Sequence, residues 1–166
     1  MAAITPLLKF IEEGTVGAEI GVRAGDSSEL ILQIPGTRLL CIDPWSATPG
    51  YGESLDYKII KAEAMRKLSP FGDRATIVEC ISSEASLLVD EYSLDFAFLD
   101  GNHSFPFVLA DCLIWWPKIK PGGILCGHDI GIHKPPTHEA KRAVDRFSHN
   151  IGRPVEAHGE CWLIRK

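Results

Sequence analysis

Two pairs of acidic and histidine side chains in the second half of the chain have the residue types needed for proton transfer and metal binding. Asp100 is followed three residues later by His103, and His128 is followed directly by Asp129. Each pair comes after an apolar run that we expect to be a strand, and neighbouring parallel strands would bring both pairs to one edge of a sheet. Carboxylate oxygens suit Mg²⁺ or a similar divalent ion, and an imidazole can accept a hydroxyl proton near neutral pH.

Each of the two histidines allows more than one role. We expect His103 to be a general base beside Asp100, with a helix N-cap or a supporting contact as the alternative. His128 is a candidate metal ligand together with Asp100 and Asp129, and a nitrogen ligand would favour Mn²⁺, Fe²⁺ or Zn²⁺ over Mg²⁺. The alternative for His128 is that it points away from the site and caps a loop.

A second candidate site, built around glycine, lies near the N-terminus. The segment Thr15–Gly25 reads T-V-G-A-E-I-G-V-R-A-G, and a later apolar run ends at Asp43. This order is typical of a strand that enters a Gly-rich turn and a helix, followed by a second strand ending in an acid, which together hold an adenosine-type cofactor. Gly21 and Gly25 would let the backbone approach the ligand closely, and Asp43 would accept hydrogen bonds from the ribose hydroxyls.

Glu19 separates two kinds of cofactor. A dinucleotide fingerprint would need glycine at this position, and the carboxylate of Glu19 would instead face a pyrophosphate. A zwitterionic ligand that carries a sulfonium tolerates that carboxylate far better, so we expect Glu19 to face the pocket of such a ligand. A nicotinamide-dependent oxidoreductase is therefore the runner-up hypothesis.

The elements that must position these residues alternate along the chain. Apolar periodicity predicts strands near residues 16–20, 37–42, 75–79, 94–99 and 122–127, and helices near 4–13, 26–34, 55–69, 83–89, 104–117 and 138–150. Two further strand-like runs near the C-terminus predict a hairpin that adds an antiparallel strand. The expected fold is α/β, with a Rossmann-like, doubly wound and mostly parallel sheet of seven strands between two layers of helices.

Other loops and helices also carry residues for which the sequence predicts a role. The stretches Pro44–Ser54 and Gly131–Thr137 follow strand ends and are candidate substrate loops, and His133 and His138 could contact substrate from the second of them. Asp111 falls inside the expected helix 104–117, where we expect a structural role. Pro121-Gly122-Gly123 is expected to be a turn that launches the fifth strand.

Composition limits the classes of function. The 166 residues can bury one core and are expected to form a single domain, residues 1–166. The formal charge of −5, without a basic stripe, disfavours nucleic acid and favours a small-molecule substrate. We expect a cytoplasmic protein, because no targeting or membrane-spanning pattern is present. The five cysteines form no C-x-x-C pair and are expected to be reduced.

These motifs resemble those of a known family. Glu19-Ile-Gly-Val-Arg-Ala-Gly25, the D-G-N-H block from Asp100 and the P-G-G…H-D block ending at Asp129 are similar to motifs of class I S-adenosylmethionine-dependent methyltransferases. The small-molecule O-methyltransferase group (methyltransferase domain 24) resembles the chain from about Val16 to the C-terminal strand.

The resemblance implies roles for individual residues. It implies that Ser82 contacts adenine and that Glu19 reaches the cofactor through water or its amino group. From its place after the second strand, we expect Trp45 to stack on adenine or to line the acceptor site. In metal-dependent members, acids at the positions of Asp100 and Asp129 hold the ion, and the resemblance supports His103 as the base. Asp100 is also expected among the residues that bind the cofactor.

We therefore expect a metal-assisted O-methyltransferase that acts on a hydroxylated small molecule such as a sugar, polyketide or phenolic compound. A subunit that binds S-adenosylmethionine without catalysis is an alternative from another class. The short chain leaves little to cover an acceptor, so a second copy could complete the pocket through the segment 4–13, and a homodimer is one expectation.

Overall fold

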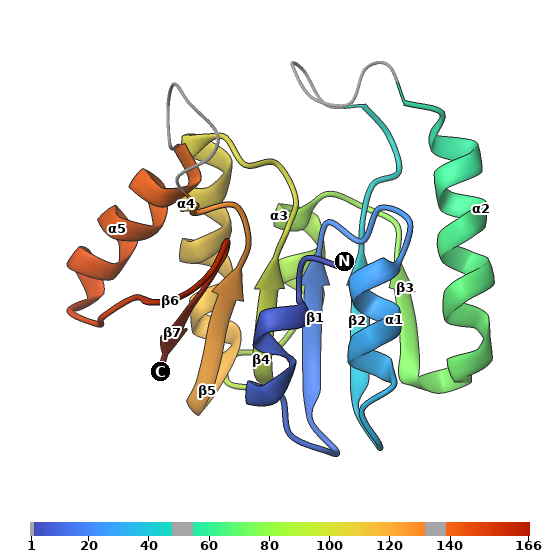
Figure 1. Ribbon diagram of the computed structural model, residues 1–166, viewed down its shortest axis with the longest axis horizontal. Helices are drawn as coiled ribbons and strands as arrows, with labels where there is room; N and C mark the ends of the chain where they lie inside the picture. The colour runs from blue at the N-terminus through green and yellow to red at the C-terminus, as the bar shows by residue number, and fades with distance from the viewer. Residues whose placement is uncertain (1, 48–54, 132–138) are drawn as a thin grey trace.

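The computed structural model describes residues 2–47, 55–131 and 139–166. The strands found in these residues form one seven-stranded sheet in the order β3-β2-β1-β4-β5-β7-β6 (Figure 1). They are β1 (Val16–Ile20), β2 (Arg38–Ile42), β3 (Ala75–Val78), β4 (Leu94–Leu99), β5 (Ile119–Gly127), β6 (Glu156–His158) and β7 (Cys161–Arg165). Strands β1 to β5 pair in parallel, and β7 is antiparallel to both β5 and β6. The predicted fold class and C-terminal hairpin are confirmed.

Helices cover both faces of the sheet. The α-helices are α1 (Asp26–Leu32), α2 (Tyr57–Leu68), α3 (Ser82–Ala85), α4 (Phe105–Trp115) and α5 (Glu139–Ile151). Short 3₁₀ helices are η1 (Thr5–Phe10), η2 (Ser69–Arg74), η3 (Ser86–Leu88) and η4 (Trp116–Lys118). Side chains alternate along β4, so Phe96 and Phe98 pack in the core beneath η1, α1 and α2, whereas Ala97 and Leu99 pack beneath α3, α4 and α5.

The strand order reverses between β1 and β4. Strand β1 pairs with β2 on one side and with β4 on the other, so the chain leaves β1 toward one half of the sheet and returns at β4 to build the other half. Ligands bind open α/β sheets outside the carboxyl ends of the strands at such a switch point. Gly21 follows β1 and Asp100 follows β4, which places both residues there.

Three predicted elements differ in the structure. The helix expected at 4–13 is the 3₁₀ helix η1, and the helix expected at 83–89 is the single α-turn α3 continued by η3, because segments this short gain little from α-helical propagation. Strand β5 begins at Ile119 rather than near 122. The Pro121-Gly122-Gly123 segment lies inside β5 as a bulge, with a register shift against β4 and a positive φ of 86° at Gly122.

Two general findings concern cysteines and membranes. All five cysteines are free thiols, and Cys80 alone among them is only half-buried. Among the helices of the described residues, none has the length and apolar character needed to cross a bilayer.

Candidate active site

Two pockets lie at the carboxyl end of the parallel strands within the described part of the chain. The first encloses about 160 Å³ and the second about 410 Å³. Gly21, Arg23 and Asp100 line both. A ligand that occupied the two pockets together would therefore pass the ends of β1 and β4 at the switch point.

The first pocket is mainly apolar. Ile20 and Ile42 come from the ends of β1 and β2, Phe107 comes from α4, and Asp43 and Ser82 add polar groups. An apolar slot beside an acid at the end of the second strand suits a nucleoside, whose ribose hydroxyls need acceptors and whose base needs apolar contact.

The backbone conformation at the end of β1 requires glycine at position 21, whether or not a ligand is bound. Its φ is +97°, and a Cβ atom added there would lie 2.5 Å from the carbonyl oxygen of Asp100. We predicted Gly21 from close approach of the backbone to a ligand. The structure shows in addition that β1 and β4 come too close together at this point to admit any side chain.

Asp43 organises the loops around the first pocket. Its Oδ2 accepts a hydrogen bond from the backbone N–H of Arg23 (2.8 Å), and its Oδ1 accepts one from the N–H of Trp45 (2.7 Å). Burial raises the pKa of Asp43, and these two hydrogen bonds oppose the shift. Each carboxylate oxygen retains a lone pair, so Asp43 can still accept hydrogen bonds from a ribose.

Trp45 supports the loop after β1. Its indole N–H donates to the carbonyl oxygen of Arg23 (2.8 Å), and its side chain is buried in the core beneath α1 and α2. Both residues have positive φ angles, 51° at Arg23 and 40° at Trp45. Trp45 lies outside the linings of the two pockets, and so does Gly25, where an added Cβ would meet the backbone of Ala64 in α2. The adenine-stacking and acceptor roles predicted for Trp45 are therefore not seen in this arrangement.

Glu19 is a buried carboxyl group beneath the second pocket. Because its neighbours in β1 face the opposite core, its side chain points to α1, where the hydroxyl of Ser28 donates to Oε2. Burial raises the pKa of Glu19 well above its usual range, nearby Asp100 and Asp43 add to the shift, and the Ser28 hydrogen bond opposes it. The second pocket therefore contains a carboxyl group that holds its proton readily.

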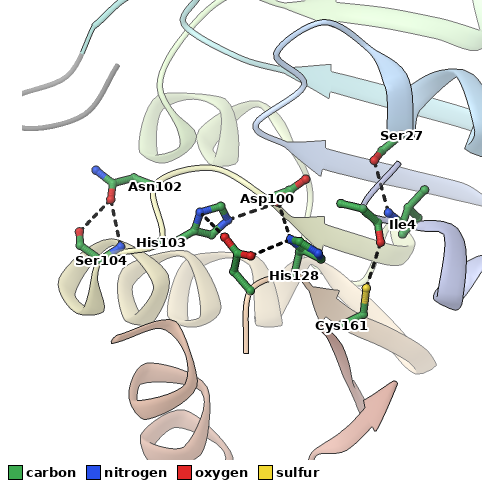
Figure 2. A network of polar contacts seen from close by, with 10 residues as sticks. Ile4, Ser27, Asp100, Asn102, His103, Ser104, His128 and Cys161 are labelled. Atoms are coloured by element: carbon green, nitrogen blue, oxygen red, sulfur yellow. Dashed lines mark hydrogen bonds and ion pairs between the residues drawn. The ribbon is translucent and has the colours of Figure 1, made fainter. Parts of the chain in front are cut away.

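The structure brings the two predicted acid–histidine pairs together in the second pocket (Figure 2). His103 Nδ1 lies 3.2 Å from Asp129 Oδ2, and His103 Nε2 lies 3.3 Å from Asp100 Oδ1. His128 Nδ1 lies 3.1 Å from Asp129 Oδ1 and 3.7 Å from Asp100 Oδ1. Asp129, at 8% side-chain exposure, thus lies between two imidazoles.

Local hydrogen bonds hold His103 in place. The side-chain oxygen of Asn102 accepts hydrogen bonds from both the backbone N–H (3.0 Å) and the hydroxyl (2.8 Å) of Ser104, which tightens the turn into α4 (Figure 2). Glu139 of α5 accepts the N–H of Phe105 (3.1 Å) at the start of the same helix. The loop that carries His103 is therefore fixed at both ends, since the N–H of Asp100 also donates to Ile20 (2.8 Å).

The metal centre predicted at Asp100, His128 and Asp129 stays a prediction. Both oxygens of Asp129 and Oδ1 of Asp100 face imidazole nitrogens, and the Oδ1 atoms of both acids lie near Nδ1 of His128. Among the described residues, no group of three or more His, Cys, Asp or Glu side chains is arranged to hold a metal ion. His133 and His138, and most of the two predicted substrate loops, lie outside the described residues.

Asp111 lines the first pocket, although the sequence predicted only a structural role for it. It lies on α4 one turn after Phe107, and both line the pocket. The helical spacing of these two residues was the available signal, because positions i and i+4 share a face. Ser82 lines the same pocket, and its contact with adenine stays a prediction.

The sheet order, the antiparallel β7 and the pockets at the switch point define a Rossmann-like methyltransferase fold. Residues 18–130 match the family described as "Methyltransferase domain". The chain belongs to this methyltransferase domain family. A search of curated protein sequences finds no match.

Solved structures share the fold at low sequence identity. The O-methyltransferase NovP is 16% identical, with a TM-score of 0.69 over 92% of this chain and 72% of that one. An O-methyltransferase from Bacillus cereus in complex with SAH is 15% identical, with a TM-score of 0.64 over 92% and 75%. A putative rRNA methylase from Clostridium thermocellum is 14% identical, with a TM-score of 0.67 over 95% and 90%.

Proposed function

We propose that the protein is an S-adenosylmethionine-dependent methyltransferase that methylates a hydroxyl oxygen of a small molecule such as a sugar, polyketide or phenolic compound. The observation that carries this proposal is the position of Asp100, which lines both pockets and lies 3.3 Å from the imidazole of His103. A methyl donor that spanned the pockets would pass its reactive centre beside a candidate base.

The two pockets suit the two halves of the donor. The apolar first pocket with Asp43 suits a nucleoside, and the polar second pocket, with Glu19 and Arg23, suits an amino acid group. S-adenosylmethionine supplies a methyl group activated by a sulfonium, which leaves as a neutral thioether. The B. cereus neighbour, solved with SAH, supports this choice of ligand.

His103 would remove the proton of the acceptor. As the hydroxyl oxygen forms its bond to the methyl carbon, the proton moves to Nε2 of His103, and the carbon–sulfur bond breaks with its electron pair on sulfur. Asp129 would hold Nδ1–H and stabilise the imidazolium that forms. Once Nε2 carries the proton, Oδ1 of Asp100, 3.3 Å away, would accept a hydrogen bond from it and further stabilise the imidazolium. Metal assistance, expected from the sequence, has no part in this proposal, because the same carboxylate oxygens contact imidazoles.

Calorimetric titration with S-adenosylhomocysteine, with NAD as the control ligand, tests the donor. Micromolar binding of S-adenosylhomocysteine without NAD binding supports the methyltransferase, and the reverse result supports the oxidoreductase. His103→Gln should retain binding and lower turnover by about 10²–10⁴-fold in a screen of hydroxylated acceptors. The matched control is His149→Gln, which changes an exposed histidine on α5. Equal turnover by the His103 variant would remove it from the mechanism, and binding without turnover by the wild type would favour a non-catalytic subunit.

A further inference from the structure

A largely buried polar cluster links α3 and α4 in the wall of the first pocket. Ser82, the first residue of α3, donates its hydroxyl hydrogen to Asp111 Oδ1 of α4 at 2.5 Å. The same hydroxyl oxygen accepts the indole N–H of Trp115 at 2.9 Å. Trp115 is fully buried, so this donor fixes the direction of the Ser82 hydroxyl.

The cluster leaves one carboxylate oxygen for a ligand. Asp111 is only 9% exposed, yet its residual surface lines the first pocket. Within the described residues, Oδ2 of Asp111 accepts no hydrogen bond from the protein, whereas Oδ1 accepts one from Ser82. Burial raises the pKa of Asp111 to about 6, and the Ser82 hydrogen bond opposes the shift. This oxygen therefore keeps its lone pairs for a donor from the pocket side.

The expected position of the ribose indicates which part of a ligand would donate a hydrogen bond to Asp111. With the ribose at Asp43 on the end of β2, the base would extend into the rest of the pocket, whose apolar lining includes Ile81 and Phe107. Besides Tyr57 and Asn102, the polar groups of this lining include Ser82 and Asp111. An edge of the base, rather than its faces, would meet them, because the apolar side chains suit the faces.

We propose that Asp111 selects the nucleobase of the donor, with its free carboxylate oxygen accepting a hydrogen bond from an exocyclic amino group, as on a 6-aminopurine. Ser82 is a positioning residue that holds the carboxylate. This inference rests on the proposed S-adenosylmethionine-dependent function and assigns a specificity role to a residue of α4 that the mechanism does not use.

A 6-oxopurine would be rejected for a physical reason. Its oxygen would present lone pairs to the carboxylate in place of hydrogens, so two acceptors would face each other and Asp111 would gain no hydrogen bond from this group. A lost pairing of this kind costs about 10- to 100-fold in affinity. The substitution Asp111→Asn changes this preference, because the side-chain amide can still accept from Ser82 through its oxygen while its amino group donates to a 6-oxo group.

The test compares S-adenosylhomocysteine with S-inosylhomocysteine, its 6-oxo counterpart, by calorimetric titration. The wild type should bind the amino compound about 10- to 100-fold more tightly, and Asp111→Asn should reduce that ratio to about threefold or less. Asp90→Asn, an exposed acid between η3 and β4, is the matched control and should keep the wild-type ratio.

Two results overturn the inference. The first is equal affinity of the wild type for the two compounds. The second is an affinity ratio in folded Asp111→Asn that equals the wild-type ratio. If Asp111→Asn does not fold, Ser82→Ala is measured in its place. We expect a reduced affinity ratio in Ser82→Ala, and an unchanged ratio would contradict the inference. Failure of the wild type to bind either compound would instead reject the donor itself, and with it the proposed function.

Discussion

The Nδ1 atom of His103, in the loop after β4, lies 3.2 Å from Oδ2 of Asp129, in the loop after β5. Two adjacent parallel strands therefore deliver an imidazole and the carboxylate that orients it. Asp129 has a φ of +62°, a conformation that asparagine and aspartate adopt more readily than most residues. This backbone angle makes Asp129→Asn a variant that removes charge with little change in backbone strain.

We expect Asp129→Asn to lower kcat by at least about tenfold, because the imidazolium loses its counter-charge. The upper limit is the loss of about 10²–10⁴-fold that is typical when the base itself is removed. Binding of S-adenosylhomocysteine should change little. Removing the negative charge also favours neutral imidazole, so the rising limb of the pH–rate profile should move to lower pH. A variant with the wild-type kcat and pH profile would show that Asp129 has no part in proton transfer.

Gly21→Ala should be strongly destabilising, because its Cβ would lie 2.5 Å from the carbonyl oxygen of Asp100 at a φ of +97°. Gly14→Ala is the control, since Gly14 has a φ of +74° and open space around the added atom. We expect a loss of about 1–2 kcal/mol for Gly14→Ala from the backbone alone, and a clearly larger loss for Gly21→Ala. Urea denaturation measures both, and equal losses would contradict the crowding argument.

Asp43→Ala should weaken binding of S-adenosylhomocysteine. The change removes the acceptor for ribose and also the hydrogen bonds from the N–H groups of Arg23 and Trp45. Loss of hydrogen bonds to a charged acceptor predicts a Kd about 10- to 100-fold higher. Asp43→Asn keeps an acceptor oxygen and should lose less, so calorimetry on the pair separates the two contributions. An unchanged Kd in Asp43→Ala would remove Asp43 from the ligand site.

Asp111 should make stability depend on pH. Its pKa rises from 3.8 to about 6 on folding, so the folded chain binds the proton more tightly. The stability that this group contributes is present below about pH 4 and is lost as pH rises through about 6, which amounts to about 3 kcal/mol for two pK units. Asp111→Asn should therefore gain stability relative to the wild type as pH rises from about 4.5 to about 7 in urea denaturation. A difference that stays constant across that range would contradict the shift.

Chelation should leave turnover unchanged. The carboxylate oxygens of Asp100 and Asp129 contact imidazole nitrogens in the described residues, so the proposed proton transfer needs no ion. Assays with and without EDTA check this for the acceptor found in the screen. Activity lost with EDTA and restored by Mg²⁺ would return the metal to the mechanism and show that the network rearranges.

The order of strands and helices, the C-terminal hairpin and the place of the Gly-rich turn could be predicted because they depend on local patterns. Apolar periodicity decides the type of an element, and the rules of parallel sheets bring the ends of β1, β2, β4 and β5 to one edge. The convergence of Asp100, His103, His128 and Asp129 followed from those rules. Their roles in binding and catalysis stay predictions.

Only the tertiary structure decided which side chains meet. Trp45 follows a strand end just as Asp43 does, yet packing beneath α1 and α2 removes it from the pocket. Asp111 looked like an ordinary helical acid until the packing of α3 on α4 placed it beside Ser82 in a pocket wall. The carboxylates expected to bind metal also face imidazoles, and metal binding stays a prediction. Such pairings depend on distances between segments far apart in the chain, which local periodicity does not encode.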